Sequence, residues 1–251
     1  MKILILAGRG DFSNAVINSI RNDFDEVSVI IEEPVPRLLF LKRRIKKLGL
    51  ATVVGQVLFQ AIIVPILNRK SFNRITEIKK ESNLDYSDRW KALIEWKHVK
   101  SINDEETIKF IHQYNPNIIV INGTRIISTN VLNATRVPFI NLHMGITPKY
   151  RGVHGGYWAV SCDDYDNCGV TVHLVSSGID TGDVIIQARI QVTNRDSFVT
   201  YPYLQATAGI PLEKKVLYDF EKTGTIDTKK INLPSKLWSH PTLWQYLSKR
   251  G

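Results

Sequence analysis

Short apolar runs rich in Val and Ile alternate with helix-forming segments along this chain, and this alternation constrains the fold more than any other feature. Six runs are predicted as strands: Lys2–Leu6, Val27–Ile31, Ile118–Ile121, Phe139–Leu142, Gly169–Val175 and Val184–Val192. Phe12–Arg21, Asn103–Tyr114 and Tyr201–Thr223 are predicted as helices. This order predicts an α/β fold, a Rossmann-like and mainly parallel twisted sheet covered by helices.

The chain has 251 residues, enough for one hydrophobic core with an appendage. We expect one domain over residues 1–197, with a helical insertion near residues 38–67. Residues 198–251 are expected to add a C-terminal helix and tail that pack on the same domain.

A glycine turn, Gly8-Arg9-Gly10, follows the first predicted strand. Backbone N–H groups at the start of a helix form a natural anion site, so Gly8 and Arg9 are candidate substrate-binding residues. The same elements begin a dinucleotide-binding unit, and Glu32 and Glu33 follow the second strand. However, Ser13 stands where the third glycine of that fingerprint belongs, which disfavours a nicotinamide cofactor.

The formal net charge is +9, and six basic residues cluster between Arg37 and Lys47. No aromatic interleaving or RNA-binding motif accompanies them, so a nucleic-acid partner is not expected. The cluster fits a solvated helix face, a site for an anionic small molecule, or contact with an acidic membrane surface. Cys162 and Cys168 are too few for a disulfide framework and form no metal motif. With no signal peptide in MKILILAGRG, the sequence predicts a cytoplasmic protein with reduced thiols and no metal.

Leu48–Leu67 contains twenty residues without a charge. Three interpretations stay open. The favoured one is one or two buried helices inserted in the α/β domain, which could also form a homodimer contact. The basic residues before the segment also fit an interfacial helix and peripheral contact with a membrane. A membrane span is long enough but is disfavoured by the glycines, glutamines and Pro65 within it.

Asn141 and His143 lie two residues apart at the end of a predicted strand, so their side chains share one face. An Asn amide can donate to an oxygen that gains negative charge, and a His can exchange a proton near neutral pH. Asp180, in GIDTGDVI, adds a carboxylate on a second predicted loop. Taken alone, the Asn is more often a turn residue and the His a structural one. Together the three fit acyl transfer without a covalent intermediate.

Three stretches resemble consecutive motifs of the 10-formyltetrahydrofolate-dependent formyltransferases: NPNIIVINGTRIISTNVLN, FINLHMGITPKYRGVHGGYWAV and GVTVHLVSSGIDTGDVIIQARI. This family includes glycinamide ribonucleotide transformylase, methionyl-tRNA formyltransferase and the sugar N-formyltransferases. The resemblance covers about Asn115–Val192 and extends only loosely to the N-terminal unit. It implies 10-formyltetrahydrofolate as co-substrate and a primary amine as acceptor.

The resemblance implies a role for each residue of the motif. Asn141 would stabilise the oxyanion of the tetrahedral intermediate, His143 would hydrogen-bond that oxygen or move protons, and Asp180 would organise the His and relay the amine proton through water. The folate would enter a slot lined by two loops, with these candidate residues: Thr124, Arg125, Ile126, Ile127, Val175, Ser176 and Gly178. Core packing is the alternative for the two isoleucines.

Other residues of the motifs are candidates for contacts with the amine. Tyr150 and Arg151 are expected to shape the floor of the pocket. His154, in the loop after TPKYRG, could face the amine substrate or be structural. His173, inside VTVHLV, is expected to be a strand histidine with its hydrogen bonds satisfied.

Departures from the family pattern narrow the acceptor. The glycinamide ribonucleotide enzymes carry a Gly-, Ser- and Asn-rich phosphate loop, whereas this chain has GRGDFSN. The tRNA enzymes carry a C-terminal barrel domain, for which too few residues follow the last predicted strand here. By elimination, the expected acceptor is a small amine, an amino sugar linked to a nucleotide, as in the synthesis of surface polysaccharides such as lipopolysaccharide. The alternatives are the two other family activities, hydrolysis of 10-formyltetrahydrofolate, and a non-catalytic folate- or nucleotide-binding module.

Overall fold

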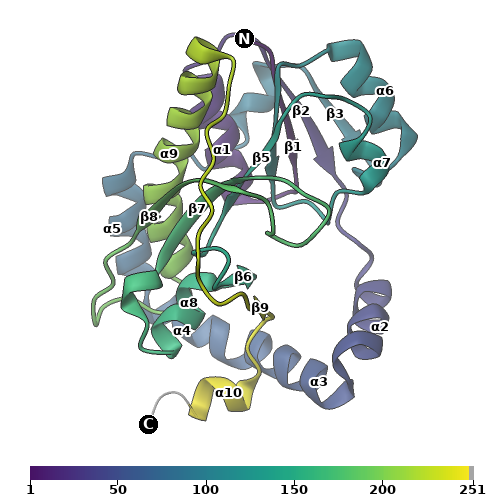
Figure 1. Ribbon diagram of the computed structural model, residues 1–251. Coiled ribbons are helices and arrows are strands. Elements are labelled where there is room, and N and C mark those ends of the chain that lie inside the picture. Colours follow the sequence, from purple (N-terminus) through teal and green to yellow (C-terminus); the bar gives the residue numbers. More distant parts are fainter. Residues whose placement is uncertain (249–251) are drawn as a thin grey trace.

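A seven-stranded sheet organises the protein, whose computed structural model describes residues 1–248 (Figure 1). Its strands are β1 (Ile3–Ala7), β2 (Val27–Glu32), β3 (Trp96–Val99), β4 (Ile118–Asn122), β5 (Phe139–His143), β7 (Gly169–Leu174) and β8 (Val184–Arg189). Their order across the sheet is β3-β2-β1-β4-β5-β7-β8. The first five are parallel to one another, and β7 and β8 are antiparallel to their neighbours. The predicted fold class is therefore confirmed.

Helices cover both faces of this sheet because its strands are apolar on both sides. Along β1, Ile3 and Ile5 pack under α1 (Asp11–Arg21) and α9 (Tyr201–Thr223), whereas Leu4 and Leu6 face α6 (Glu105–Tyr114) and α7 (Thr129–Leu132). The alternation follows from the two-residue period of a strand. Figure 1 shows α1 and α9 on one side of the sheet and α6 and α7 on the other.

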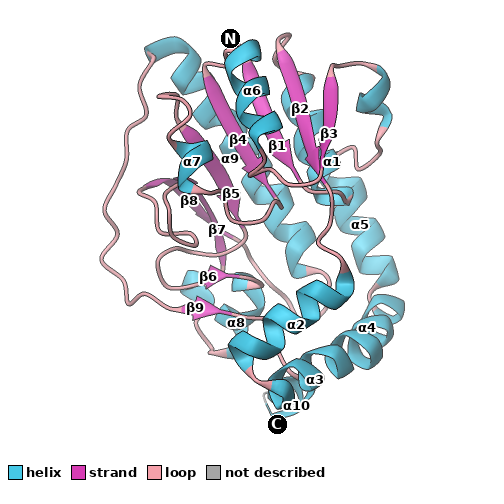
Figure 2. Cartoon of the chain, turned by 90° about the vertical axis from the view of Figure 1, so that its right-hand side faces the viewer, coloured by secondary structure: helices cyan, strands magenta, loops and turns pink. Residues whose placement is uncertain are grey.

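The predicted insertion is helical, but its apolar part is only partly buried, whereas buried helices were expected. It consists of α2 (Arg37–Leu48), α3 (Leu50–Leu58), the π-helical turn η1 (Phe59–Ile63) and α4 (Val64–Lys70), and α5 (Phe72–Ser82) follows. None of the residues of α2 is buried. The insertion lies along one end of the molecule, beyond the ends of the strands, so only one side of α3 and α4 meets the rest of the protein (Figure 2).

The C-terminal tail crosses that same end of the molecule. Its short strand β9 (Leu237–Trp238) pairs with β6 (Arg151–Gly152), and α10 (Leu243–Ser248) then packs against α3. A third apolar cluster, rich in aromatic side chains, joins the tail to α8 (Gly155–Ser161) and η1. Two short 3₁₀ turns, η2 (Arg89–Ala92) and η3 (Tyr165–Asn167), complete the elements. The loop expected around His154 ends at Gly155, where α8 begins.

One buried carboxyl group lacks a hydrogen-bond partner among the described residues. Glu213 on α9 is fully buried, and both of its carboxyl oxygens are unpaired there. Burial raises the pKa of Glu213 from 4.5 to about 8. Because the pKa of Glu213 is higher in the folded state, its contribution to the free energy of unfolding is fully present below pH 4.5. That contribution is lost as the pH rises toward 8. At neutral pH the folded protein must hold a proton that the unfolded chain releases.

Replacing Glu213 by Gln is therefore expected to raise the free energy of unfolding by about 3 kcal/mol at pH 7, and by much less at pH 4. Urea unfolding at the two pH values measures both quantities. Glu81→Gln, at an exposed carboxylate of α5, is the matched control and should change stability little. An equal gain at both pH values would contradict the titration argument.

Candidate functional site

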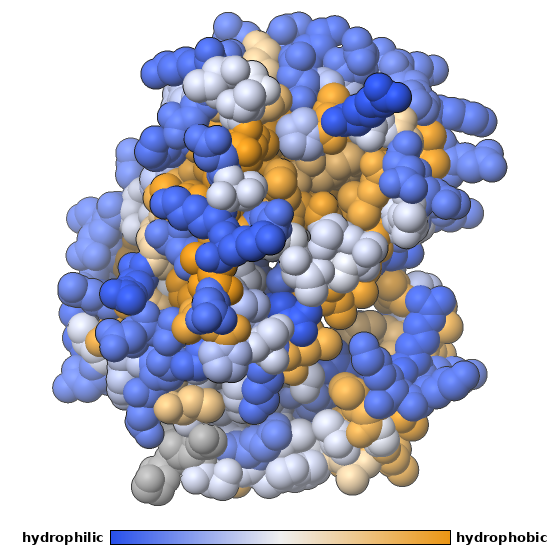
Figure 3. Space-filling view, viewed as in Figure 1, coloured by the Kyte–Doolittle hydropathy of each residue, from blue (hydrophilic) through white to orange (hydrophobic). Residues whose placement is uncertain are grey.

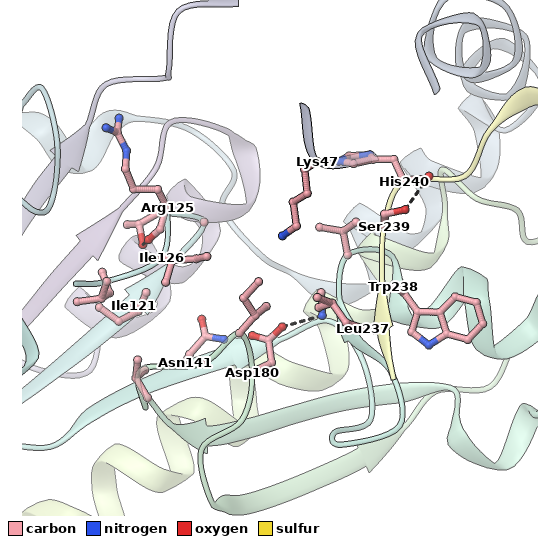
Figure 4. Close-up of a pocket in the computed structure, with 18 of the residues that line it drawn as sticks. Lys47, Ile121, Arg125, Ile126, Asn141, Asp180, Leu237, Trp238, Ser239 and His240 are labelled. Atoms are coloured by element: carbon pink, nitrogen blue, oxygen red, sulfur yellow. Dashed lines mark hydrogen bonds between the residues drawn. The ribbon is translucent and has the colours of Figure 1, made fainter. Parts of the chain in front are cut away.

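A cavity of about 800 Å³ opens at the carboxyl ends of β4 and β5, beside the boundary between β1 and β4 where the strand order reverses. Ligands of open α/β sheets bind at such ends. Four segments enclose it: the loop after β4, the loop between β7 and β8, helix α2, and the tail around β9 (Figure 4). Its lining is mostly apolar with a few convergent polar groups, which is typical of small-molecule sites.

Asn141 is held in the cavity by a histidine on the neighbouring strand. The antiparallel register places His173 of β7 opposite Asn141 of β5, and Asn141 Nδ2 lies 3.1 Å from His173 Nε2. His173 Nδ1 donates to the carbonyl oxygen of Leu174 at 2.7 Å, so in the neutral imidazole Nε2 is the acceptor. The amide nitrogen of Asn141 therefore donates one hydrogen to His173 and keeps a second for the cavity.

His143 and Asp180 form a pair next to Asn141, in which His143 is buried and Asp180 reaches the cavity wall. His143 Nε2 donates to the carbonyl oxygen of Tyr150 at 2.7 Å, and its Nδ1 lies 3.4 Å from Asp180 Oδ2. The N–H of Gly152 donates to the same carboxylate oxygen at 2.8 Å. Because Nε2 already carries a proton, Nδ1 is the position where the imidazole can take up another one, next to the carboxylate.

At neutral pH the two members of this pair differ in charge, His143 being neutral and Asp180 ionised. Burial lowers the pKa of His143 below its usual value, although the charge of Asp180 opposes the shift. Burial alone would raise the pKa of Asp180, but the neighbouring imidazoles of His173 and His143 and the hydrogen bond from the N–H of Gly152 lower it. At neutral pH the site therefore holds a neutral imidazole and a carboxylate, a combination that can accept a proton.

Unusual backbone geometry fixes the loops that carry these groups. Asp180 has a φ of 50°, in the left-handed region that non-glycine residues rarely adopt. Gly152 has a φ of 95°, and a Cβ there would collide with the carbonyl oxygen of Trp238. Because residue 152 is a glycine, the tail at Trp238 can pack closely against it, and its own N–H donates to Asp180.

The residues predicted to bind folate line the cavity on two loops: Thr124, Arg125, Ile126, Ile127, Val175, Ser176 and Gly178. Ile126 is 58% exposed on the cavity wall, whereas Ile127 is 5% exposed and belongs to the core. The side chain of Arg125 points away from the cavity toward β2 (Figure 4), where its Nε lies 2.7 Å from Glu32. Glu32 also accepts the N–H groups of Ile102 and Arg125, so it is not free to bind a ribose.

The predicted substrate-binding residues are dispersed. Gly8 and Arg9 line a second cavity of about 600 Å³, where Arg9 donates to His98. Tyr150 is buried and its hydroxyl donates to Asp164, while Arg151 donates to the carbonyl oxygen of Ile179. Neither residue is part of the lining of the first cavity, although Tyr150 accepts from His143.

His154 is also placed behind the cavity wall. It lies 2.9 Å from His240, which lines the cavity, and its ring packs against Phe198. Burial lowers the pKa of His154 to about 3 and that of His240 to about 4. Both rings are therefore neutral near pH 7, and their contacts are structural.

Three parts of the site were missed by sequence reasoning. His173 was expected only as a strand histidine with its hydrogen bonds satisfied, and the strand register reveals that one of its partners is Asn141. The tail supplies Leu237, Trp238, Ser239 and His240 to the lining. On the opposite side α2 contributes Arg43, Arg44 and Lys47, which the sequence showed as a basic cluster without a location. Figure 4 shows Lys47 extending into the cavity toward the side of Asn141 and Asp180.

Comparison with known proteins gives consistent matches. A sequence model described as formyl transferase matches residues 60–208. The methionyl-tRNA formyltransferase of Finegoldia magna is 32% identical over 124 residues, which are 49% of this chain and 40% of that protein. The chain thus spans less than half the length of such curated relatives.

Solved structures of low sequence identity share the fold. A sugar N-formyltransferase from a Shewanella species superposes with a TM-score of 0.59 at 15% identity, covering 94% of this chain and 76% of that one. The phosphoribosylglycinamide formyltransferase of Coxiella burnetii gives 0.60 at 20% identity, covering 91% and 90%.

Proposed function

Because this chain belongs to the formyl transferase family, we propose that it transfers the formyl group of 10-formyltetrahydrofolate to a primary amine, and that the amine belongs to a nucleotide-linked amino sugar. The observation that carries the proposal is the group of Asn141, His143, Asp180 and His173 at one end of an apolar cavity. Acyl transfer to an amine requires a hydrogen-bond donor to the carbonyl oxygen and an acceptor for the amine proton, and this group of side chains provides both.

Asn141 is the proposed donor to the formyl oxygen. As the amine attacks the formyl carbon, that oxygen gains negative charge, and a preoriented N–H next to it lowers the barrier. The hydrogen bond to His173 fixes the amide plane, so that the second amide hydrogen needs no reorientation during the reaction. His173 is thus proposed as a positioning residue for Asn141.

The pair of His143 and Asp180 is the proposed acceptor of the amine proton. The nitrogen must lose a proton as it forms its new bond to carbon, and the departing nitrogen of the donor must gain one. A carboxylate 3.4 Å from an unprotonated ring nitrogen can hold that proton between the two groups and return it. Neither a nucleophilic side chain nor a covalent intermediate is needed.

The wall formed by the loops after β4 and β7 suits the folate ring system. It combines exposed apolar surface from Ile126 with the backbone groups of Thr124 and Val175–Gly178, as a flat heterocycle with polar edges requires. When bound, 10-formyltetrahydrofolate supplies the activated formyl group. The residues of this wall orient it and keep water away from the reacting carbon.

The opposite wall supports an anionic acceptor. Arg43, Arg44 and Lys47 lie on one face of α2 and line the cavity, while Asp180 is the acidic side chain in that lining. Arg44 is held in place by donating to Gln56 Oε1 at 2.6 Å. Guanidinium and ammonium groups bind phosphate oxygens well, so a nucleoside diphosphate could lie along α2 with its sugar amine directed at Asn141 and Asp180.

A formylation assay over several amines tests the proposal. The protein is incubated with 10-formyltetrahydrofolate and, in turn, nucleotide-linked amino sugars, glycinamide ribonucleotide and methionyl-tRNA, while the release of tetrahydrofolate and the mass of the acceptor are followed. We expect a formylated amino sugar, and no product with an N-acetylated control sugar. Formylation of methionyl-tRNA alone would replace the proposed acceptor, and release of formate without any amine would indicate a hydrolase.

A further inference from the structure

The helical segment from Arg37 to Lys70 exposes apolar side chains that neither the core nor the cavity uses. They are Leu38, Leu39, Ile45, Leu50, Val54, Val57, Leu58, Ile62 and Ile66. Leu38 is 76% exposed and Leu50 62%. Figure 3 shows this apolar surface beside hydrophilic side chains over α2 and α3, at the lower right. An exposed apolar surface of this extent marks a contact with a partner.

One side of α3–α4 is anchored to the body and the other is free. Val53, Phe59 and Leu67 are buried, and Phe59 packs against Phe198 and Tyr246. The free side repeats every four residues from Leu50 through Val54, Leu58, Ile62 and Ile66, which gives one continuous stripe along the helix.

This anchoring decides how the segment can meet a bilayer. By length and composition alone, Leu50–Lys70 could cross a membrane, and 28% of its most apolar window is buried. Crossing would pull Phe59 and Leu67 from the core and break the bonds of Gln56 to Arg44 and to the His240 carbonyl oxygen. Lying flat keeps these contacts and buries only the free stripe.

The charges around the stripe are of one sign. Residues 37–70 contain eight lysines and arginines and no aspartate or glutamate. On α2 the two faces differ. Phe40, Arg43, Arg44, Lys47 and Leu48 line the cavity, whereas Leu38, Lys42, Ile45 and Lys46 lie on the opposite side of the helix. The outer face thus combines apolar side chains with ammonium groups, as interfacial helices do.

We propose that α2, α3 and α4 dock flat on a bilayer that contains anionic phospholipids. A second copy of this chain on the same surface would bring cations against cations with no acidic residue in either segment. A bilayer offers an apolar layer for the stripe and phosphate groups for the cations. Because α2 is also a wall of the cavity, docking places the cavity next to the membrane surface.

Vesicle flotation tests this proposal without any formyl transfer. We expect the protein to float with vesicles of phosphatidylcholine and phosphatidylglycerol, about tenfold more than with phosphatidylcholine alone, and to be released by high salt. Two variants should each lower binding several-fold: the apolar pair Ile45→Ser and Ile62→Ser, and the charge pair Lys42→Gln and Lys46→Gln. All four side chains are exposed, so both variants should remain folded.

A matched control removes the same kinds of group elsewhere. Leu93→Ser with Lys109→Gln, at exposed positions outside the segment, should leave vesicle binding unchanged. Failure of the wild-type protein to bind anionic vesicles would overturn the proposal. So would equal losses in the control variant, or a wild-type dimer in solution that the Ile45→Ser and Ile62→Ser variant converts to a monomer.

Discussion

Replacing Asn141 by Ala is expected to lower kcat about 10²–10³-fold while the substrates still bind. The reason is that the amide of Asn141 donates to the formyl oxygen most strongly when that oxygen is negatively charged. Loss of an interaction that strengthens in the transition state lowers kcat more than it raises KM. Steady-state kinetics with 10-formyltetrahydrofolate and the acceptor found in the formylation assay measure both constants.

The structural cost of this change should be small. Asn141 loses one hydrogen bond, to His173 Nε2, which contributes about 1 kcal/mol to stability. Asn194→Ala, at an exposed amide outside the cavity lining, controls for the loss of an asparagine. If Asn141→Ala kept near-normal kcat, its role as the donor to the formyl oxygen would be wrong.

The sheet was predictable from sequence because its central strands are buried on both faces. Runs such as Ile3–Leu6 and Ile118–Ile121 are short, continuously apolar and rich in Ile and Val, which favours strands buried on both faces. The edge strand β3, Trp96–Val99, was missed, since only Val99 in it is buried and it contains Lys97 and His98. A continuous apolar run in the sequence indicates a strand that is buried on both faces. An edge strand is less buried, so its sequence lacks such a run.

Burial of the insertion could not be deduced from hydrophobicity. Leu48–Leu67 is as apolar as a core helix, and the sequence contains no signal for which side meets the body. Phe59 is buried against Phe198 and Tyr246, whereas its neighbour Leu58 is exposed, and both partners of Phe59 come from distant parts of the chain. Such contacts are tertiary and leave no local trace.

The same distinction applies to the site. Asn141 and His143 are recognisable because they lie two residues apart on one strand. His173 lies thirty-two residues from Asn141, and its role depends on the register of β5 and β7. The tail residue Trp238 reaches the cavity through pairing with Gly152. Local chemistry was readable, whereas the walls of the cavity come from long-range packing.

Asp180→Asn is expected to lower kcat about 10²–10⁴-fold with little change in KM, since it removes the carboxylate that shares the amine proton with His143. The amide fits the same space and can still accept from the N–H of Gly152, so the loop should keep its shape. It cannot be protonated at neutral pH, and the proton then has no place between Oδ2 and Nδ1.

Asp183→Asn, at an exposed carboxylate three residues away, is the matched control and should retain kcat. Near-normal turnover in Asp180→Asn, with the control also active, would show that the amine proton leaves by another route.

The pH profile separates this role from a structural one. The pKa values of His143 and Asp180 both lie below their ordinary values, so wild-type activity should persist as the pH falls through 6.5, the ordinary pKa of histidine, and decline only below it. The charge of Asp180 raises the pKa of His143, which means that its removal lowers that pKa further. The acid limb of the residual activity in Asp180→Asn should therefore move to lower pH. A limb that stayed in place would mean that His143 does not titrate in the step that limits turnover.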